Sequence, residues 1–343
     1  MFSPPPSKPR YIAIYDTAGV PVWWTSTAAR PLYSALLSDG NLAATFADGT
    51  VEEIRFDGSV AHVLRPTIGT ADFHDLQLLR GGNYLIVTNI ARSGMDLTSW
   101  GGPNSAVILD QVIQEISPNG ALVWSWDAYN HIARDETDPQ WRSQVLRAGA
   151  PYDIFHWNSI EPTDDGVIVS YRHLDAVYKI NKGNSSIEWK LGGSPRSESL
   201  TIDGDPVFAA GGGFGGQHDA RLLQDGTLTL HDNGTGRSRS PRAVRYKVDM
   251  SSGRATLISD LVDSSVTGSI CCGGARRLIG GNWVTSWGAN PWVTEYTGRG
   301  DLLFRLTFVD GNIFSYRADP VSFGRLPRGL LREGMDSQYP RTK

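Results

Sequence analysis

A strand–turn–strand pattern recurs along this chain, and it limits the fold more than any other feature. The pattern is clearest in 217–230, where two apolar runs flank an Asp-Gly pair. It recurs in 73–87, 155–169 and 273–284, and more weakly in 32–42. Asp-Gly and Gly-Gly pairs supply the positive φ angles that two-residue hairpins need. Internal repeats of this length predict a repeat architecture built from hairpins.

Each copy is followed by a second hairpin. One such hairpin spans 112–126 with a turn at Pro118-Asn119-Gly120, and another spans 176–190. The repeating unit is therefore four short antiparallel strands, which is one blade of a β-propeller. Five units are visible. A lone hairpin at 11–24 lacks a first half, and we expect residues 312–317 to supply it, because pairing the first and last strands removes free edges.

We therefore predict an all-β protein that forms a single six-bladed propeller, closed by pairing of its N- and C-terminal strands. The propeller should span 11–325, with a Pro-rich segment at 1–10 and a tail at 326–343. No helix of useful length is expected apart from a helical turn near 139–146. Insertions at 91–104, 130–150 and 194–216 should lie on one face and cover a site.

Composition narrows the functional classes. With 343 residues, a net charge of −4 and a pI near 6.0, the chain has no general attraction for nucleic acid. No apolar run reaches the roughly 20 residues that a membrane span requires. The N-terminus has no signal-peptide pattern, so the protein is either cytoplasmic or exported after removal of a leader, with export the favoured alternative. The sequence leaves the oligomeric state open.

The two cysteines, Cys271 and Cys272, are neighbours. They are either two buried thiols or a vicinal disulfide, which would imply an oxidising compartment. We predict that they bond to each other under oxidising conditions. Two adjacent cysteines alone make a poor metal site.

Histidines mark the candidate site. When the repeats are aligned on the glycine of the first turn, His74 and His218 occupy one column, and His156 joins them if its blade carries two extra turn residues. Innermost strands line a propeller's channel, so these three side chains should converge at one mouth. A lone histidine in a strand is usually structural, but three in one column are harder to explain that way. Arg172 lies nearby in sequence, and a buried arginine needs either a carboxylate partner or a substrate anion.

Two chemistries suit three histidines and an arginine. A zinc site is one, but a fixed cation beside a dication is unfavourable, and we predict neither metal nor cofactor. The other is group transfer from an anionic donor. One imidazole would attack, another would protonate a phenolate leaving group, and the arginine would neutralise the transferring oxygens.

Several motifs resemble the aryl-sulfate sulfotransferase family: Phe155-His156-Trp157-Asn158, Ser170-Tyr171-Arg172-His173 and Gln217-His218-Asp219. The resemblance extends from about residue 10 to 320. It implies a six-bladed propeller that moves sulfate between phenols through a transient sulfohistidine, without a nucleotide donor. It assigns the nucleophile to His218, and sulfuryl binding and proton transfer to His156, Arg172 and His74. Beside these, we expect five residues to contact a small aromatic or phenolic substrate: His173, Asn158, Trp157, Trp287 and Trp292.

The sequence also departs from this family. The segment 288–296 and the adjacent cysteines resemble a branch of small, divergent homologues, and the family's large N-terminal domain is not found in this sequence. Alternative functions therefore stay open: a propeller recruited to other small-molecule chemistry such as a cycloaddition or cyclisation, a non-catalytic propeller that binds aromatic ligands, or a metal-dependent hydrolase. The tryptophans could equally form core.

Overall fold

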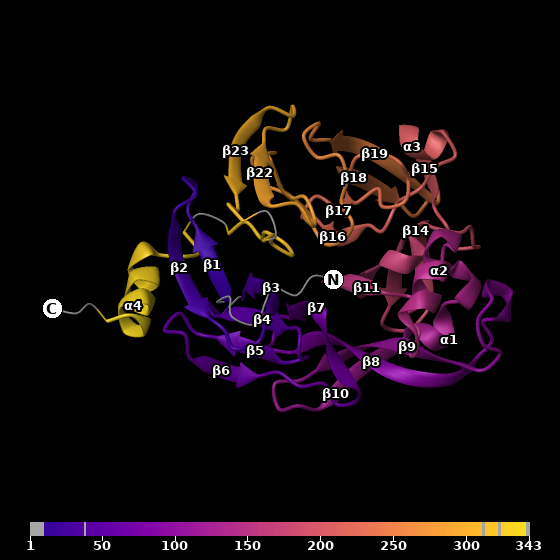
Figure 1. Ribbon diagram of the computed structural model, residues 1–343, viewed down its shortest axis with the longest axis horizontal. Coiled ribbons are helices and arrows are strands. Elements are labelled where there is room, and N and C mark those ends of the chain that lie inside the picture. Colours follow the sequence, from indigo (N-terminus) through magenta and orange to yellow (C-terminus); the bar gives the residue numbers. More distant parts are fainter. Residues whose placement is uncertain (1–9, 38, 311–312, 322–323, 341–343) are drawn as a thin grey trace.

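The computed structural model describes residues 10–37, 39–310, 313–321 and 324–340, and these residues are mostly β-structure. Five sheets of antiparallel strands succeed one another around a common centre (Figure 1). Blade one consists of β3 (Pro31–Leu36), β4 (Leu42–Phe46), β5 (Val51–Ile54) and β6 (Val60–Val63). Blade two consists of β7 (Thr70–Leu78), β8 (Tyr84–Met95), β9 (Ala106–Ile116) and β10 (Leu122–Asp127). Blade three consists of β11 (Trp157–Pro162), β12 (Gly166–Tyr171), β13 (Ala176–Asn181) and β14 (Ile187–Gly192).

Blades four and five complete the series. Blade four carries a fifth strand, β15, which pairs in parallel with β19 and comes from the insertion at 194–216. Blade four consists of β15 (Thr201–Asp203), β16 (His218–Leu222), β17 (Thr227–Asp232), β18 (Arg242–Asp249) and β19 (Arg254–Leu261). Blade five consists of β20 (Gly274–Arg277), β21 (Trp283–Ser286), β22 (Trp292–Tyr296) and β23 (Leu302–Thr307). In the first turn of blade four Gly226 has a positive φ of +75°, as expected for the glycine, but Leu223 pairs with Thr227 across a three-residue loop, so the turn is longer than the predicted two-residue hairpin.

The prediction of six closed blades is wrong. The structure has five blades and a separate two-stranded hairpin, β1 (Tyr11–Tyr15) and β2 (Pro21–Ser26), which lies between blades one and five (Figure 1). Of the segment expected to complete this hairpin, Asn312 lies outside the described residues, and 313–317 form no strand. This segment enters the centre of the ring, where Arg317 is buried and paired with carboxylates, so its backbone is not available to β1 or β2.

Short helical elements lie in all three insertions, and one further helix packs on the outside of the ring. The helical turn expected near 139–146 is present as α2 (Pro139–Ala148), whose N-terminus is capped by Asp138. The tail forms α4 (Arg328–Gln338), which packs Leu331 and Met335 against the β1–β2 hairpin. Shorter elements are α1 (Ala128–His131), α3 (Pro206–Ala209), η1 (Thr98–Trp100), η2 (Arg134–Glu136) and η3 (Arg172–Leu174). No described helix has the length and apolar character needed to cross a bilayer.

Candidate active site

The three histidines of the repeat column all lie at irregularities of innermost strands. The pairing register shifts between Ala71 and Leu76 around His74, between Trp157 and Ser159 just after His156, and between His218 and Arg221. His156 and Asp219 both have positive φ, at 53° and 60°. A bulge redirects side chains and is common beside active sites. The bulges therefore turn the histidines out of the regular in-and-out alternation of their strands.

His74 and His156 are each held by a carboxylate. The ring Nδ1 of His74 lies 2.5 Å from Asp72 Oδ1, and that of His156 lies 2.5 Å from Asp153 Oδ2. Burial acts to raise the pKa of Asp153, but the charge and hydrogen bond of His156 outweigh it and hold this pKa well below its usual range. The two rings are 5.1 Å apart, centre to centre, in an edge-to-face arrangement. The carboxylates thus fix Nδ1 as the protonated nitrogen and leave Nε2 for a ligand.

Arg172 and His173 follow β12 in the turn η3. The ring of His173 lies 4.6 Å from that of His156, tilted by 31°, and its Nε2 accepts a hydrogen bond from the Arg172 guanidinium at 3.0 Å. Burial, and then the neighbouring His156, lower the pKa of His173 to about 3, so this ring is neutral. The guanidinium of Arg172 lies 4.0 Å from the ring centre of Trp141, in α2. The insertion at 130–150 therefore contributes to the site by holding the arginine.

The neighbours of His218 determine which of its two ring nitrogens carries the proton. Its Nδ1 lies 2.8 Å from Gly216 O and 2.9 Å from Asn233 Oδ1, both acceptors, so Nδ1 carries the proton. Its Nε2 accepts a hydrogen bond from the backbone N–H of Cys272 at 3.0 Å. Burial, followed by the charge of Arg172, lowers the pKa of His218 well below its usual value. His218 is therefore a neutral imidazole with its lone pair on Nε2.

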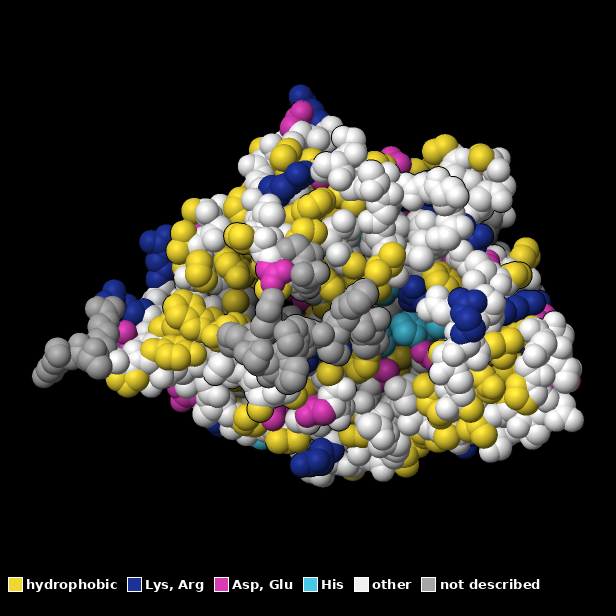
Figure 2. All heavy atoms as spheres, in the orientation of Figure 1, with side chains coloured by type: hydrophobic (Ala, Val, Ile, Leu, Met, Phe, Trp, Pro, Cys, Tyr) yellow, Lys and Arg dark blue, Asp and Glu magenta, His cyan; other side chains and the backbone are white. Residues whose placement is uncertain are grey.

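The site is nearly closed. His74, Arg172, His173 and His218 are each buried, and the His156 side chain is the most open at 25% exposure. Histidine atoms are visible in a hollow of the surface near β11 (Figure 2). A substrate would therefore reach the cluster past His156.

Below the histidines, an ion network fills the centre of the ring. Asp75 and Asp219, which directly follow two of the column histidines, are both fully buried. Arg221 pairs with both of them at 2.6 and 2.8 Å, and Arg317 lies 3.5 and 3.3 Å from them. This network links blades two and four to the C-terminal segment, and it gives the site a rigid floor.

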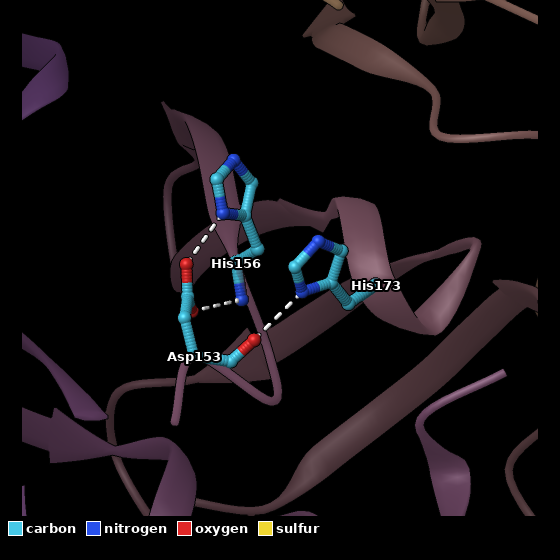
Figure 3. A group of neighbouring side chains, drawn as sticks. All are labelled: Asp153, His156 and His173. Carbon is cyan, nitrogen blue, oxygen red and sulfur yellow. Dashed lines mark hydrogen bonds and ion pairs between the residues drawn. The ribbon is translucent and has the colours of Figure 1, made fainter. Parts of the chain in front are cut away.

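A metal ion suits this site poorly. Asp153, His156 and His173 present possible ligand atoms within 4.8 Å of one another. Figure 3 shows, however, that both Nδ1 atoms are bonded to Asp153, through its carboxylate and its carbonyl oxygen. The Nε2 lone pair of His173 is also taken by the hydrogen bond from Arg172, so this ring has no nitrogen left for a metal, and the guanidinium would repel a cation. The group is better suited to orienting two imidazoles than to binding a metal.

The structure brings the predicted catalytic residues together, with the predicted substrate contacts His173 and Trp157 beside them, but it places Asn158, Trp287 and Trp292 elsewhere. The ring of Trp157 lies 5.9 Å from His74. Asn158 is engaged structurally, donating to Gln217 O at 2.8 Å between blades three and four. Trp287 packs on His231 and bonds Thr294, and Trp292 lies under Arg305, which places both in the body of blade five.

Sequence reasoning missed several residues of the site. Tyr316 lies between two of the histidines, 5.9 Å from His74 and 6.4 Å from His218 by ring centres. Asp72 and Asp153 were also missed, although an Asp two or three residues before a histidine is a readable signal. The cysteines are free thiols here, so the predicted disulfide is absent from the structure. Its formation under oxidising conditions stays a prediction.

Comparisons with known proteins bear on the fold and the family of this chain. No curated protein matches the sequence. A protein of unknown function from Bacteroides caccae is similar in structure, with a TM-score of 0.56 at 12% identity over 89% of this chain and 93% of that one. A functionally unknown protein from Desulfotomaculum acetoxidans has a TM-score of 0.50 at 10% identity, over 88% and 94%. At such identities these likenesses show the fold alone. The model of the arylsulfotransferase (ASST) family matches residues 50–309. This chain belongs to the arylsulfotransferase family.

Proposed function

We propose that this protein transfers a sulfuryl group from an aryl sulfate to a phenolic acceptor, with His218 as the nucleophile and no nucleotide donor. The observation that carries the proposal is the pairing of a neutral, oriented imidazole with a buried arginine that has no carboxylate partner. Arg172 donates to two neutral acceptors, Ile270 O and His173, and forms no ion pair within the described part of the chain. A buried cation of this kind calls for an anionic ligand.

The chemistry starts from charge. A sulfate monoester is an anion and therefore repels anionic nucleophiles. It does not repel the neutral Nε2 of His218. Nε2 would attack sulfur, forming the N–S bond as the bond from sulfur to the aryl oxygen breaks. The departing phenolate would take a proton from Nε2 of His156 or His74, which must enter this step as an imidazolium and leaves it as the neutral ring, with Nδ1–H still held by Asp153 or Asp72. Arg172 would neutralise the sulfuryl oxygens throughout.

The second half-reaction reverses the first. An acceptor phenol would return its proton to the same histidine, and its oxygen would attack sulfur while the N–S bond breaks. The two half-reactions together exchange one phenol for another and leave the protein unchanged, which gives ping-pong kinetics. The N–H of Cys272 now donates to Nε2, so this contact must open before attack. After attack the same N–H would lie beside the sulfuryl oxygens.

The test combines kinetics and mass measurement. With p-nitrophenyl sulfate and phenol, we expect acceptor-dependent release of p-nitrophenol. With donor alone at low temperature, intact-protein mass spectrometry should find one added sulfuryl group. His218→Ala should lose both signals. The matched control is His62→Ala, because His62 lies in β6 with an exposed side chain. This variant should keep both the p-nitrophenol release and the added sulfuryl group. A His218→Ala protein that transfers at near the normal rate would refute the nucleophile, and a normal protein inert to aryl sulfates would refute the reaction.

A further inference from the structure

Tyr316 has a buried hydroxyl without a partner. Its oxygen is inaccessible to solvent and has no hydrogen bond with any described residue. The ring nevertheless contacts two site histidines, His74 and His218. Buried polar groups are nearly always paired in native proteins, and an exception calls for an explanation.

The position of Tyr316 is imposed by its backbone. The N–H of Gly273 donates to Tyr316 O at 2.9 Å, and the hydroxyl of Ser286 donates to the preceding carbonyl, Ser315 O, at 3.2 Å. The following residue, Arg317, is held by the buried carboxylates Asp75 and Asp219. The segment is thus fixed at both sides of the tyrosine, and the hydroxyl contributes none of the contacts that fix it.

A second orphan group lies in the same cluster. The Nε of Arg172 is buried and has no hydrogen-bond partner, although its two other nitrogens are bonded. Burial raises the pKa of Tyr316 well above its usual value, so the phenol stays a donor near neutral pH. Two unpaired donors beside three histidines would be satisfied by one ligand that offers several acceptor oxygens. A tetrahedral oxyanion has this chemistry.

We infer that Tyr316 is a further substrate-contacting residue, whose hydroxyl donates a hydrogen bond to an oxygen of an anion bound between His74 and His218. The identity of that anion as a transferring sulfuryl group rests on the function proposed above. The inference assigns a role in the site to the C-terminal segment, which reaches it from outside the five blades.

The experiment compares Tyr316→Phe with Tyr171→Phe. Tyr171 also has a buried, unpartnered hydroxyl, but it lies in the core between blades two and three, so it is a matched control. Thermal unfolding is measured in chloride, in sodium sulfate at equal ionic strength, and with p-nitrophenyl sulfate. Initial rates with p-nitrophenyl sulfate and phenol give kcat and KM.

We expect Tyr316→Phe to keep the normal unfolding midpoint in chloride, because its hydroxyl has no partner to lose. It should lack the saturable part of the upward shift that sulfate or the aryl sulfate gives the normal protein, keeping only the general stabilisation by excluded sulfate, and its kcat/KM should fall about 100-fold, as for loss of one oxyanion donor. Tyr171→Phe should retain both the shift and the rate.

Three outcomes would overturn the inference: a normal protein with no saturable anion-dependent shift, a Tyr316→Phe protein that keeps the full saturable shift and rate, or one that is destabilised in chloride. The last would show a structural partner for the hydroxyl. A normal protein that shows the shift and loses it in Tyr316→Phe, yet transfers nothing, would support the anion contact while refuting sulfuryl transfer.

Discussion

Replacing Arg172 by Met should separate stability from activity. The side chain is buried, stacks on Trp141 and donates to Ile270 O and His173, but it has no carboxylate partner among the described residues. Arg172→Met loses two charged hydrogen bonds of about 1.5–3 kcal/mol each and an aromatic contact of about 1–2 kcal/mol. It recovers the several kcal/mol spent in removing a guanidinium from water. These contributions nearly cancel, so we expect the free energy of unfolding to change by less than about 2 kcal/mol.

Activity should respond very differently. Loss of the cation should raise the barrier to sulfuryl transfer by about 3 kcal/mol, on the scale of one oxyanion donor. At about 1.36 kcal/mol for each factor of ten, kcat/KM should fall roughly 150-fold.

The control is Arg242→Met. Arg242 is equally buried but pairs with Asp205 and Asp232 at 2.8–2.9 Å. Its loss leaves buried carboxylates without their partner and should cost about 3–5 kcal/mol. Urea unfolding and p-nitrophenol release measure the two quantities. An Arg172→Met protein destabilised as much as Arg242→Met, or one with normal kcat/KM, would refute the reasoning.

Two further predictions concern protons and thiols. His173 has its pKa lowered to about 3, and that of His218 is also lowered, so the unfolded chain binds these protons more readily than the folded one. The stability that these groups contribute is therefore fully present above pH 6.5 and falls as the pH drops from 6.5 toward 3, by about 1.4 kcal/mol per pH unit per group. Urea midpoints measured at pH 7 and pH 5 should show this fall. His173→Gln should reduce the dependence of the free energy of unfolding on pH. For the cysteines, alkylation without reductant after air oxidation should add no label if Cys271 and Cys272 bond as predicted, whereas two labels would contradict the disulfide. In the reduced protein Cys271 should react first, because a hydrogen bond with Cys272 lowers its pKa while that of Cys272 is raised.

The sequence predicts the blades well because each blade is encoded locally. Hairpins are set by alternation and by turn glycines within about 40 residues, and all five visible repeats form sheets. The closure of the ring is not local. The alternation in 313–317 suits a strand, but the fate of this segment depends on Arg317 meeting Asp75 and Asp219, which are about 240 and 100 residues earlier. No pattern within the segment reveals those partners.

The same distinction between local and distant information separates the site residues that could be predicted from those that could not. His74, His156 and His218 could be placed together because a repeat column maps to one height of a propeller. Tyr316 could not, because it belongs to no repeat. Trp287 and Trp292 were expected at the substrate because tryptophan is common in aromatic pockets, but composition does not distinguish such a pocket from the core of a blade, where both now lie.

Irregularity, rather than the regular repeat, builds this site. The repeat would place equivalent side chains at equivalent angles around the channel, and Asp75 and Asp219 follow that rule by meeting at the axis. The bulges at His74 and His218 break the alternation, so that each of these histidines and the aspartate after it serve different purposes: the histidine would face the proposed ligand, and the aspartate anchors the floor. His156 has a positive φ, which is costly for a residue with a Cβ. Three features of this site do not help a ring that only has to be stable: the strained backbone of His156, the Arg172 guanidinium without a carboxylate partner, and the Tyr316 hydroxyl without a hydrogen-bond partner among the described residues. The proposed anionic ligand would account for both unpaired donors, and the bulges would turn the histidines toward it.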